Sequence, residues 1–318
     1  MKKLPFVTCD VFTDRPFGGN PLAVFPRVEG LPTATMQAIA REFNFSETTF
    51  VEEATLAGCT CKVRIFTPRH ELKFAGHPTL GTAHVLAHSL AVAPVTPGGG
   101  HLELVFEEGV GPVPVKVTLD AGRPVFAELT AARIPEAGAP PPDAATLARV
   151  LSLDPGDLLG GPFTPQAFSC GIPFLFIPLR SRRALERARI DKTRFDEALS
   201  KYPAPDCFVF TFGDAAPDGT APKRAGDSPV EIRARMFAPA EGIEEDPATG
   251  SAAAALSGYL AARDDSKATT LRWTIHQGVE MGRPSLLQVT AERGPNGLTS
   301  VKVGGASVVM TEGEFVLP

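Results

Sequence analysis

The stretch HPTLGTA at residues 77–83 decides how this sequence is read, because it recurs as DPATGSA at residues 246–252. The two copies lie at a constant offset of 169 residues (246 − 77 = 169). A second pair precedes them, since RIFTP at 64–68 resembles RMFAP at 235–239. Internal similarity of this kind indicates a duplicated unit. The sequence therefore predicts two similar half-molecules, with a site where they face each other, because ligand sites are common at such interfaces.

A third and looser similarity links SETTFV at 46–51 with PDCFV at 205–209. Apolar runs and helical spacing around the repeats predict strands and helices. Strands are expected at 6–12, 22–25, 48–51 and 61–66, and helices at 33–43, 78–90 and 249–263. Strands and helices do not alternate one to one, so we expect an α+β fold and not a doubly wound parallel sheet. The Pro- and Ala-rich segment 135–142 favours a connection between the halves.

Length and composition exclude several classes of protein. A chain of 318 residues is long enough for two cores. Its net charge of -5 argues against a nucleic-acid surface, which needs a local excess of Lys and Arg. No apolar run approaches the about 18 residues that a membrane span needs. We therefore expect a cytoplasmic protein that acts on a small molecule and binds neither nucleic acid nor membrane.

The cysteines and histidines do not form a metal or redox motif. The cysteines stand at positions 9, 59, 61, 170 and 207, a spacing that matches neither a zinc ribbon nor a redox pair. His84 and His88 are four residues apart on an expected helix, a spacing that can bind zinc. Val85 follows His84, however, where the HExxH motif has its glutamate. No phosphate-binding or nicotinamide motif follows a strand either. We expect no metal and no cofactor.

Both repeated loops open an expected helix. The first backbone N–H groups of a helix have no partner within it and bind anions readily. The amides at Gly81 and Thr82, and those at Gly250 and Ser251, are therefore candidates for holding a carboxylate. The alternative is that Thr82 and Ser251 only cap or pack their helices.

Two loops that match in sequence but differ at their first residue suggest a divided site. His77 and Asp246 occupy that place, with different charge chemistry. Asp246 would accept a hydrogen bond from an amino or hydroxyl group of the substrate. His77 would donate to the substrate near the atom that loses its proton.

Glu47 is the candidate acid and base. It follows a turn-like segment and has Phe45 and Phe50 as close neighbours in sequence. Apolar surroundings would partly desolvate the carboxyl and raise its pKa toward neutrality, where proton transfer is most effective. The alternative is an ordinary solvent-exposed glutamate, which is the commoner environment for this residue type.

Together these segments resemble the PhzF-type phenazine-biosynthesis isomerases, within the diaminopimelate epimerase-like superfamily. The resemblance runs over nearly the whole chain, and its combined motifs are specific. The matching segments are DVF at 10–12, GNPLAV at 19–24, SET at 46–48, FAGHPTLGTA at 74–83, GIP at 171–173 and EDPATGSA at 245–252.

The resemblance implies two pseudo-symmetric halves, each a curled mixed β-sheet around a central α-helix, with the active site in the cleft between them. It places the N-terminal half at 1–126, with a return of about 307–318, and the C-terminal half at 127–306. It casts Glu47 as the proton-shuttling residue, assisted by His77 and Asp246. The residues that it implies hold or orient the substrate are Asn20, Ser46, Gly76, Gly81, Thr82, Gly250 and Ser251.

The activity implied is isomerisation of a dihydro-hydroxyanthranilate, by moving a proton between ring carbons, without a cofactor and usually in a homodimer. Related epimerases and racemases use two cysteines, one in each repeated loop, and neither loop here contains one. A two-thiol racemase is thereby disfavoured, since thiolates are its acid and base. An epimerase or racemase with other bases stays open, as does a non-catalytic small-molecule-binding protein on the same fold.

Overall fold

The computed structural model describes residues 2–90, 100–212 and 228–317. The chain divides into two compact units. The N-terminal unit is Met1–Thr130 with Gly304–Pro318, and the C-terminal unit is Ala131–Val303. Each unit combines a mixed sheet with helices, so the predicted α+β class is confirmed.

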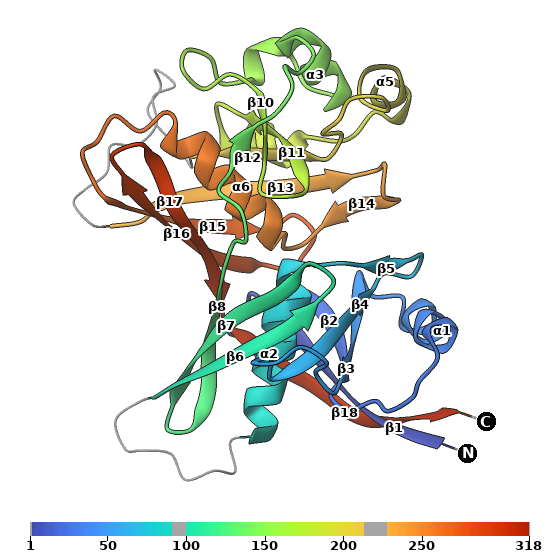
Figure 1. The fold of residues 1–318 in the computed structure, drawn as a ribbon. Helices are drawn as coiled ribbons and strands as arrows, with labels where there is room; N and C mark the ends of the chain where they lie inside the picture. The colour runs from blue at the N-terminus through green and yellow to red at the C-terminus, as the bar shows by residue number, and fades with distance from the viewer. Residues whose placement is uncertain (1, 91–99, 213–227, 318) are drawn as a thin grey trace. The chain divides into compact units, whose positions relative to one another are not determined.

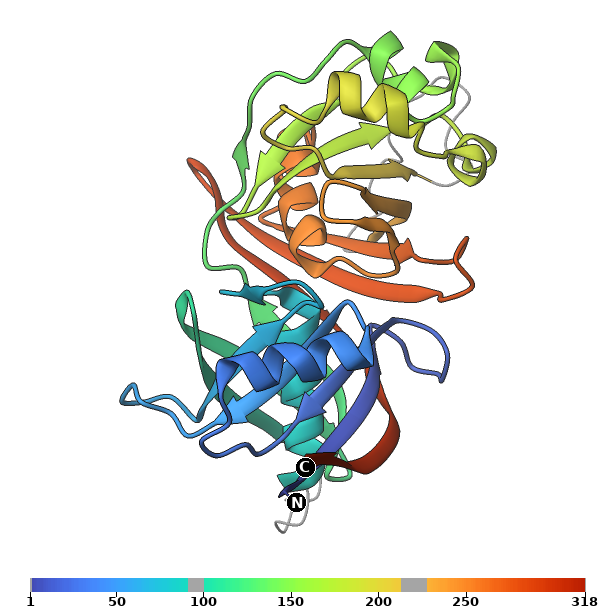
Figure 2. The same ribbon diagram turned by 90° about the vertical axis from the view of Figure 1, so that its right-hand side faces the viewer.

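The N-terminal unit is built from strands arranged around one helix. Its helices are α1 (Thr33–Phe43) and α2 (Gly76–Leu90). Its strands are β1 (Lys2–Val11), β2 (Asn20–Phe25), β3 (Glu47–Glu52), β4 (Cys61–Phe66), β5 (Glu71–Leu72), β6 (Gly100–Glu108), β7 (Gly111–Asp120), β8 (Arg123–Thr130) and β18 (Ser307–Leu317). Figures 1 and 2 show α2 running through the middle of the unit, with α1 on its outside.

Helices α1 and α2 cover opposite faces of strand β3. Met36, Ile39 and other apolar residues of α1 pack in one core cluster with Phe25 and Phe50, whose rings stack 4.9 Å apart. Successive side chains of a strand point to opposite faces. Because Phe50 points toward α1, Glu47 and Thr49 point toward α2. There Thr49 Oγ1 lies 2.8 Å from the hydroxyl of Thr82 in α2.

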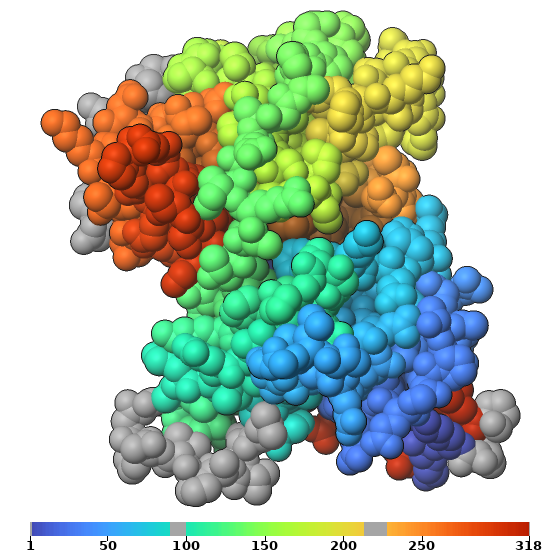
Figure 3. Space-filling model, in the orientation of Figure 1, coloured from blue at the N-terminus to red at the C-terminus, as the bar shows by residue number. Residues whose placement is uncertain are grey.

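The C-terminal unit contains four α-helices among its described residues. These are α3 (Ala144–Val150), α4 (Arg182–Arg187), α5 (Lys192–Ala198) and α6 (Gly250–Ala261). Its strands are β9 (Glu136–Ala137), β10 (Gln166–Ser169), β11 (Pro173–Pro178), β12 (Cys207–Thr211), β13 (Val230–Ala238), β14 (Ile243–Asp246), β15 (Thr270–Gln277), β16 (Ser285–Gly294) and β17 (Gly297–Gly305), in which the chain returns to the N-terminal unit. Residues 131–143 run along the surface of the unit to α3, as the green segment of Figure 3 shows.

The two units share one scheme of strand pairing. In the first, β2 and β3 are parallel, β3 and β4 antiparallel, and β4 pairs with both β5 and β6. In the second, β11 and β12 are parallel, β12 and β13 antiparallel, and β13 pairs with both β14 and β15. Helix α2 follows β5, and α6 follows β14. The predicted duplication is therefore present in the topology.

Strand register corrects one detail of that duplication. Ile65 and Met236 occupy the same place in the RIFTP and RMFAP segments. Ile65 pairs with Leu72, and Met236 pairs with Asp246. Asp246 thus corresponds to Leu72, and the two helices begin at an offset of 174 residues (250 − 76) and not 169. His77 corresponds to Ser251, and the predicted equivalence of His77 with Asp246 is wrong. The residues HPTLG are helical in the first copy, whereas DPAT in the second precedes its helix.

Candidate functional site

Four of the predicted site residues form one chain of contacts where β2, β3 and α2 begin. Asn20 opens β2, Glu47 opens β3, and His77 is the second residue of α2. Ser46 Oγ donates a hydrogen bond to Asn20 Oδ1 over 3.1 Å. Asn20 Nδ2 lies 3.4 Å from His77 Nδ1, and His77 Nε2 lies 3.3 Å from Glu47 Oε2. The parallel pairing of β2 with β3 brings these starting residues to one end of the sheet.

Asn20 determines where His77 carries its proton. Its carbonyl oxygen accepts from Ser46, so its amide nitrogen faces His77 Nδ1. An amide nitrogen can only donate, so Nδ1 accepts and the ring proton resides on Nε2. Burial lowers the pKa of His77 to about 3, which keeps the ring neutral at physiological pH. The N–H of neutral His77 is therefore on the side of the ring that faces Glu47.

The Glu47 side chain is largely withdrawn from water, with 13% of its surface exposed. The phenylalanines expected to surround it lie elsewhere. Phe50 belongs to the α1 core cluster on the other face of β3, and the Phe45 ring packs against Phe43 with centroids 5.9 Å apart. The start of α2 shields the carboxyl instead, because His77 lies there and is itself only 6% exposed.

Three further predicted residues lie on α2, and only the first is at its beginning. Gly76 opens the helix, so its amide has no partner within the helix. Gly81 lies in the second turn, where a Cβ atom would come within 2.6 Å of side-chain carbons of Val11 and Leu22. Thr82 is bonded to Thr49. The predicted carboxylate-holding role of Gly81 and Thr82 is therefore wrong, because the helix begins five residues earlier than Gly81 (81 − 76 = 5).

In the C-terminal unit, Asp246 ends β14, and Gly250 and Ser251 are the first two residues of α6. The Thr249 hydroxyl donates to Asp246 Oδ2. Gln277 Nε2 donates to the Asp246 carbonyl over 2.8 Å and to Thr249 Oγ1 over 3.0 Å. Gln277 is fully buried and was not predicted from sequence, where a polar residue ending a strand is ordinary. It fixes the loop that presents Asp246 and the α6 amides.

Glu108 is a buried carboxyl that corresponds to Gln277. Lys62 pairs with Glu107, and its counterpart Arg233 pairs with His276. The residues that follow, Glu108 and Gln277, therefore occupy equivalent positions in the two units. Glu108 Oε1 lies 2.7 Å from the hydroxyl of Thr79 in the first turn of α2. Burial raises the pKa of Glu108 to about 8. Glu108 is then protonated and uncharged at neutral pH, like the amide of its counterpart Gln277.

Glu108→Gln is expected to change how stability depends on pH. The folded-state pKa of Glu108 is raised, so between about pH 5 and about pH 8 the folded state binds more protons than the unfolded state. Wild-type stability from this group therefore falls as pH rises. The variant should not lose stability in this way as pH rises. Near pH 8 its free energy of unfolding should exceed that of wild type by on the order of a few kcal/mol.

Urea unfolding at both ends of this pH window measures the difference. Glu103→Gln is the matched control, because Glu103 is an exposed residue of the same strand β6. An unchanged pH slope in Glu108→Gln would show that Glu108 titrates normally.

Four of the five described cysteines are poorly suited to form thiolates. Burial raises the pKa of Cys61 and of Cys170 to about 12, and it raises the pKa values of Cys9 and Cys207 further. All five cysteines are free thiols. Thiol acid/base chemistry by these four residues is disfavoured.

Among residues 2–90, 100–212 and 228–317, no group of three or more His, Cys, Asp and Glu is arranged to hold a metal ion. His84 is buried in α2, and burial lowers its pKa to about 4, whereas His88 is exposed. Within the same described ranges, no helix is long and apolar enough to cross a membrane.

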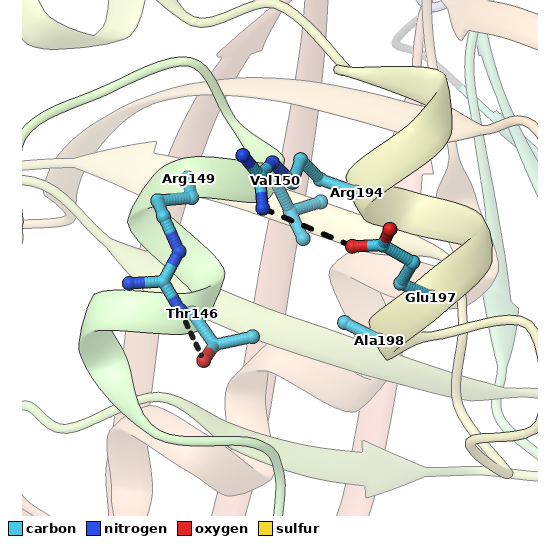
Figure 4. Close-up of a pocket in the computed structure, with 6 residues that line it drawn as sticks. All are labelled: Thr146, Arg149, Val150, Arg194, Glu197 and Ala198. Carbon is cyan, nitrogen blue, oxygen red and sulfur yellow. Dashed lines mark hydrogen bonds and ion pairs between the residues drawn. The ribbon is translucent and has the colours of Figure 1, made fainter.

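A separate surface pocket of about 220 Å³ opens between α3 and α5 (Figure 4). Its lining residues are Thr146, Arg149, Val150, Arg194, Glu197 and Ala198. Arg194 and Glu197 form an ion pair of 3.8 Å across one side. Helices α3 and α5 pack on the face of β12 that carries Cys207 and Val209, so the pocket lies across the sheet from α6.

Comparisons with known proteins identify the family of the chain. Residues 9–313 match the family described as phenazine biosynthesis-like protein. The chain is 36% identical over 315 residues to trans-2,3-dihydro-3-hydroxyanthranilate isomerase of Pseudomonas fluorescens, covering 98% of this chain and 99% of the relative. It is 34% identical over 322 residues to an uncharacterised isomerase of Mesorhizobium japonicum, covering 100% of both.

A solved structure shows the same fold. The PhzF-family phenazine biosynthesis protein of Bacillus anthracis superposes with a TM-score of 0.83 at 22% identity, covering 100% of both chains. Several curated relatives that align over nearly the full chain are named isomerases. The chain is therefore an isomerase that belongs to the phenazine biosynthesis-like protein family.

Proposed function

We propose that this isomerase shifts a proton on a small carboxylate-bearing metabolite, without a cofactor, by general acid/base catalysis through Glu47. The observation that carries the proposal is the contact chain from Ser46 through Asn20 and His77 to Glu47. It provides a nearly buried carboxyl whose neighbour is a neutral N–H donor. A carboxyl in such surroundings can both accept and return a proton.

In the proposed reaction, Glu47 as carboxylate removes a proton from a substrate carbon, and the electron pair of the C–H bond moves into the conjugated system of the substrate. Glu47, now a carboxylic acid, returns the proton to another carbon on the same face. His77 stays neutral, because its pKa is about 3. Its role is to orient the carboxyl and to donate a hydrogen bond, while Glu47 alone carries the proton.

Helix beginnings would hold the substrate carboxylate. The first amides of α2 belong to Gly76 and His77, and those of α6 belong to Gly250 and Ser251. Amides at such positions are well suited to bind anions. Asp246 would accept a hydrogen bond from a substrate amino or hydroxyl group.

The first compound to test is trans-2,3-dihydro-3-hydroxyanthranilate, which the name of the Pseudomonas fluorescens relative specifies. An NMR assay of the purified protein should show its conversion to a double-bond isomer. A product that differs only in configuration at one carbon would instead support an epimerase. Tight binding without conversion or exchange of any C–H group, across a panel of carboxylates, would support a non-catalytic binding protein.

Activity is expected to survive complete removal of metals and small molecules. Among the described residues, no three or more His, Cys, Asp and Glu side chains are grouped as a metal site needs. Chelation followed by desalting should leave the initial rate unchanged, as measured with the same NMR assay. A bound metal present in equal number to the protein, and required for turnover, would contradict the proposal.

The homodimer that the family resemblance implies and the cytoplasmic location expected from the sequence stay predictions. Sedimentation equilibrium would test the first, and cell fractionation the second.

A further inference from the structure

Asp206 is the counterpart of Glu47 in the C-terminal unit. The looser sequence similarity aligns Glu47 with Asp206, and strand register agrees with it. Thr48 pairs with Phe66, and Cys207 pairs with Phe237, the counterpart of Phe66. Glu47, which precedes Thr48, and Asp206, which precedes Cys207, therefore occupy equivalent positions. The proposed proton carrier of one unit therefore has a second carboxyl as its equivalent in the other.

The side chain of Asp206 points to the face of the sheet that α6 covers. Cys207 packs in the core cluster of α3, α4 and α5 on the other face. Alternation along the strand then turns Asp206 and Phe210 toward α6, where the Phe210 ring lies 5.7 Å from that of Tyr259.

Asp246 projects from this same face. Met236 pairs with Phe208 on one side and with Asp246 on the other, and directly paired residues share a face. Phe208 follows Asp206 by two residues, so it also points toward α6. Two carboxyls, Asp206 and Asp246, thus project from one face of the C-terminal sheet.

One oxygen of the Asp206 carboxyl lacks the hydrogen bond that a buried carboxyl oxygen normally has among the described residues. Asp206 is 8% exposed, and its Oδ1 atom has no hydrogen-bond partner among the described residues. Burial, together with the nearby charges of Glu241 and Asp246, raises the pKa of Asp206 to about 7. Buried polar atoms are nearly always paired, so an unpaired one needs an explanation.

A structural role does not explain this arrangement. Glu245, next to Asp246 in β14, is a carboxylate with a structural role, because Arg235 binds both of its oxygens over 2.9 and 2.7 Å. No cation among the described residues plays this part for Asp206, whose charged neighbours are the acidic Glu241 and Asp246. What Asp206 lacks is a donor with positive charge.

We propose that Asp206, together with Asp246, binds the protonated amino group of the substrate and makes the enzyme select amino-bearing carboxylates. An ammonium group supplies three donors and one positive charge. The identity of the substrate rests on the proposed function. In trans-2,3-dihydro-3-hydroxyanthranilate the carbon that bears the amino group is saturated, so this amine is aliphatic and protonated at neutral pH.

Asp206→Asn tests the proposal through binding, without turnover. The probes are trans-2-aminocyclohexanecarboxylate and cyclohexanecarboxylate, which differ only in the amino group, with Kd measured by NMR titration at slightly alkaline pH. Wild type should prefer the amino compound. The variant should bind it about 10-fold more weakly or worse, the usual scale for losing a hydrogen bond to a charged group, and bind the deamino compound unchanged.

Two controls separate recognition from folding. Glu241→Gln removes an exposed neighbouring charge and should keep the preference for the amino compound. Asp206→Asn should unfold at no lower urea concentration than wild type in alkaline buffer, because it removes a buried carboxyl whose pKa is raised. The wild-type preference should also weaken below about pH 7 as Asp206 takes up a proton, whereas the variant should show less of this change.

The proposal is overturned if wild type does not prefer the amino compound, or if Asp206→Asn keeps the full preference. These results are independent of catalysis by Glu47. An enzyme that isomerises its substrate but ignores the amino group would refute the role of Asp206 alone. A protein that prefers the amino compound but catalyses no proton transfer would refute the proposed function alone.

Discussion

Glu47→Gln is expected to lower turnover of the isomerase by at least about 100-fold, the usual scale for losing a general acid/base group. Glutamine keeps the shape of the side chain and can keep its close approach to His77. It cannot take a proton from carbon, because an amide is far less basic than a carboxylate. Substrate binding should survive, since the groups proposed to hold the carboxylate and the amine lie on other elements. Initial rates and Kd values, measured on the same preparation, separate the two effects.

Glu52→Gln is the matched control for this substitution. Glu52 is the last residue of the same strand β3, and it forms an ion pair of 3.2 Å with Lys62. The change of charge is identical, but the position is distant along the strand from His77. Turnover of Glu52→Gln should stay close to wild type. Near-normal turnover of Glu47→Gln would remove Glu47 from the mechanism.

His77→Phe is expected to lower turnover by about 10- to 100-fold. In the proposed reaction His77 donates a hydrogen bond, and a hydrogen bond to a charged group contributes roughly 1.5–3 kcal/mol. Phenylalanine fills the space of the ring but lacks both nitrogen atoms. The loss should be similar across the range from about pH 5 to about pH 8, since the low pKa of His77 keeps the wild-type ring neutral throughout that range. The pH profile of turnover measures this directly. His88→Phe, at an exposed position of the same helix, is the control.

The double variant distinguishes an orienting role from an independent one. If His77 acts through Glu47, adding His77→Phe to Glu47→Gln should cost little more than Glu47→Gln alone, because residues that work as one unit are not additive. If the two losses multiply instead, His77 acts on the substrate separately, and the contact chain described above is not the functional unit.

Much of the local structure could be predicted from sequence. The bounds of α1 and β4 agree with those expected, because apolar spacing is strong in both segments. Helix α2 begins at Gly76 and not at the expected residue 78. The helix was expected to begin at Pro78, because proline is common at a helix start. Proline is tolerated throughout the first turn, where the N–H that it lacks would have no partner within the helix.

The site was less accessible to sequence. His77 lies 57 residues from Asn20 along the chain, and only the family resemblance connected them. The repeat gave a wrong equivalence because Gly-Thr-Ala and Gly-Ser-Ala recur on two buried helices, where small residues allow close packing. Glu108 and Gln277 carry no signal of their own, since polar residues at strand ends are common. Their places became visible only through strand register.

The central claim is that Glu47 carries the proton. Its most direct test is an NMR time course of trans-2,3-dihydro-3-hydroxyanthranilate in D2O, which follows isomerisation and the exchange of C–H groups in the same sample. Wild type is expected to convert the compound, and Glu47→Gln is expected to slow conversion and exchange together by at least about 100-fold. Conversion or exchange at an undiminished rate in Glu47→Gln would contradict the claim.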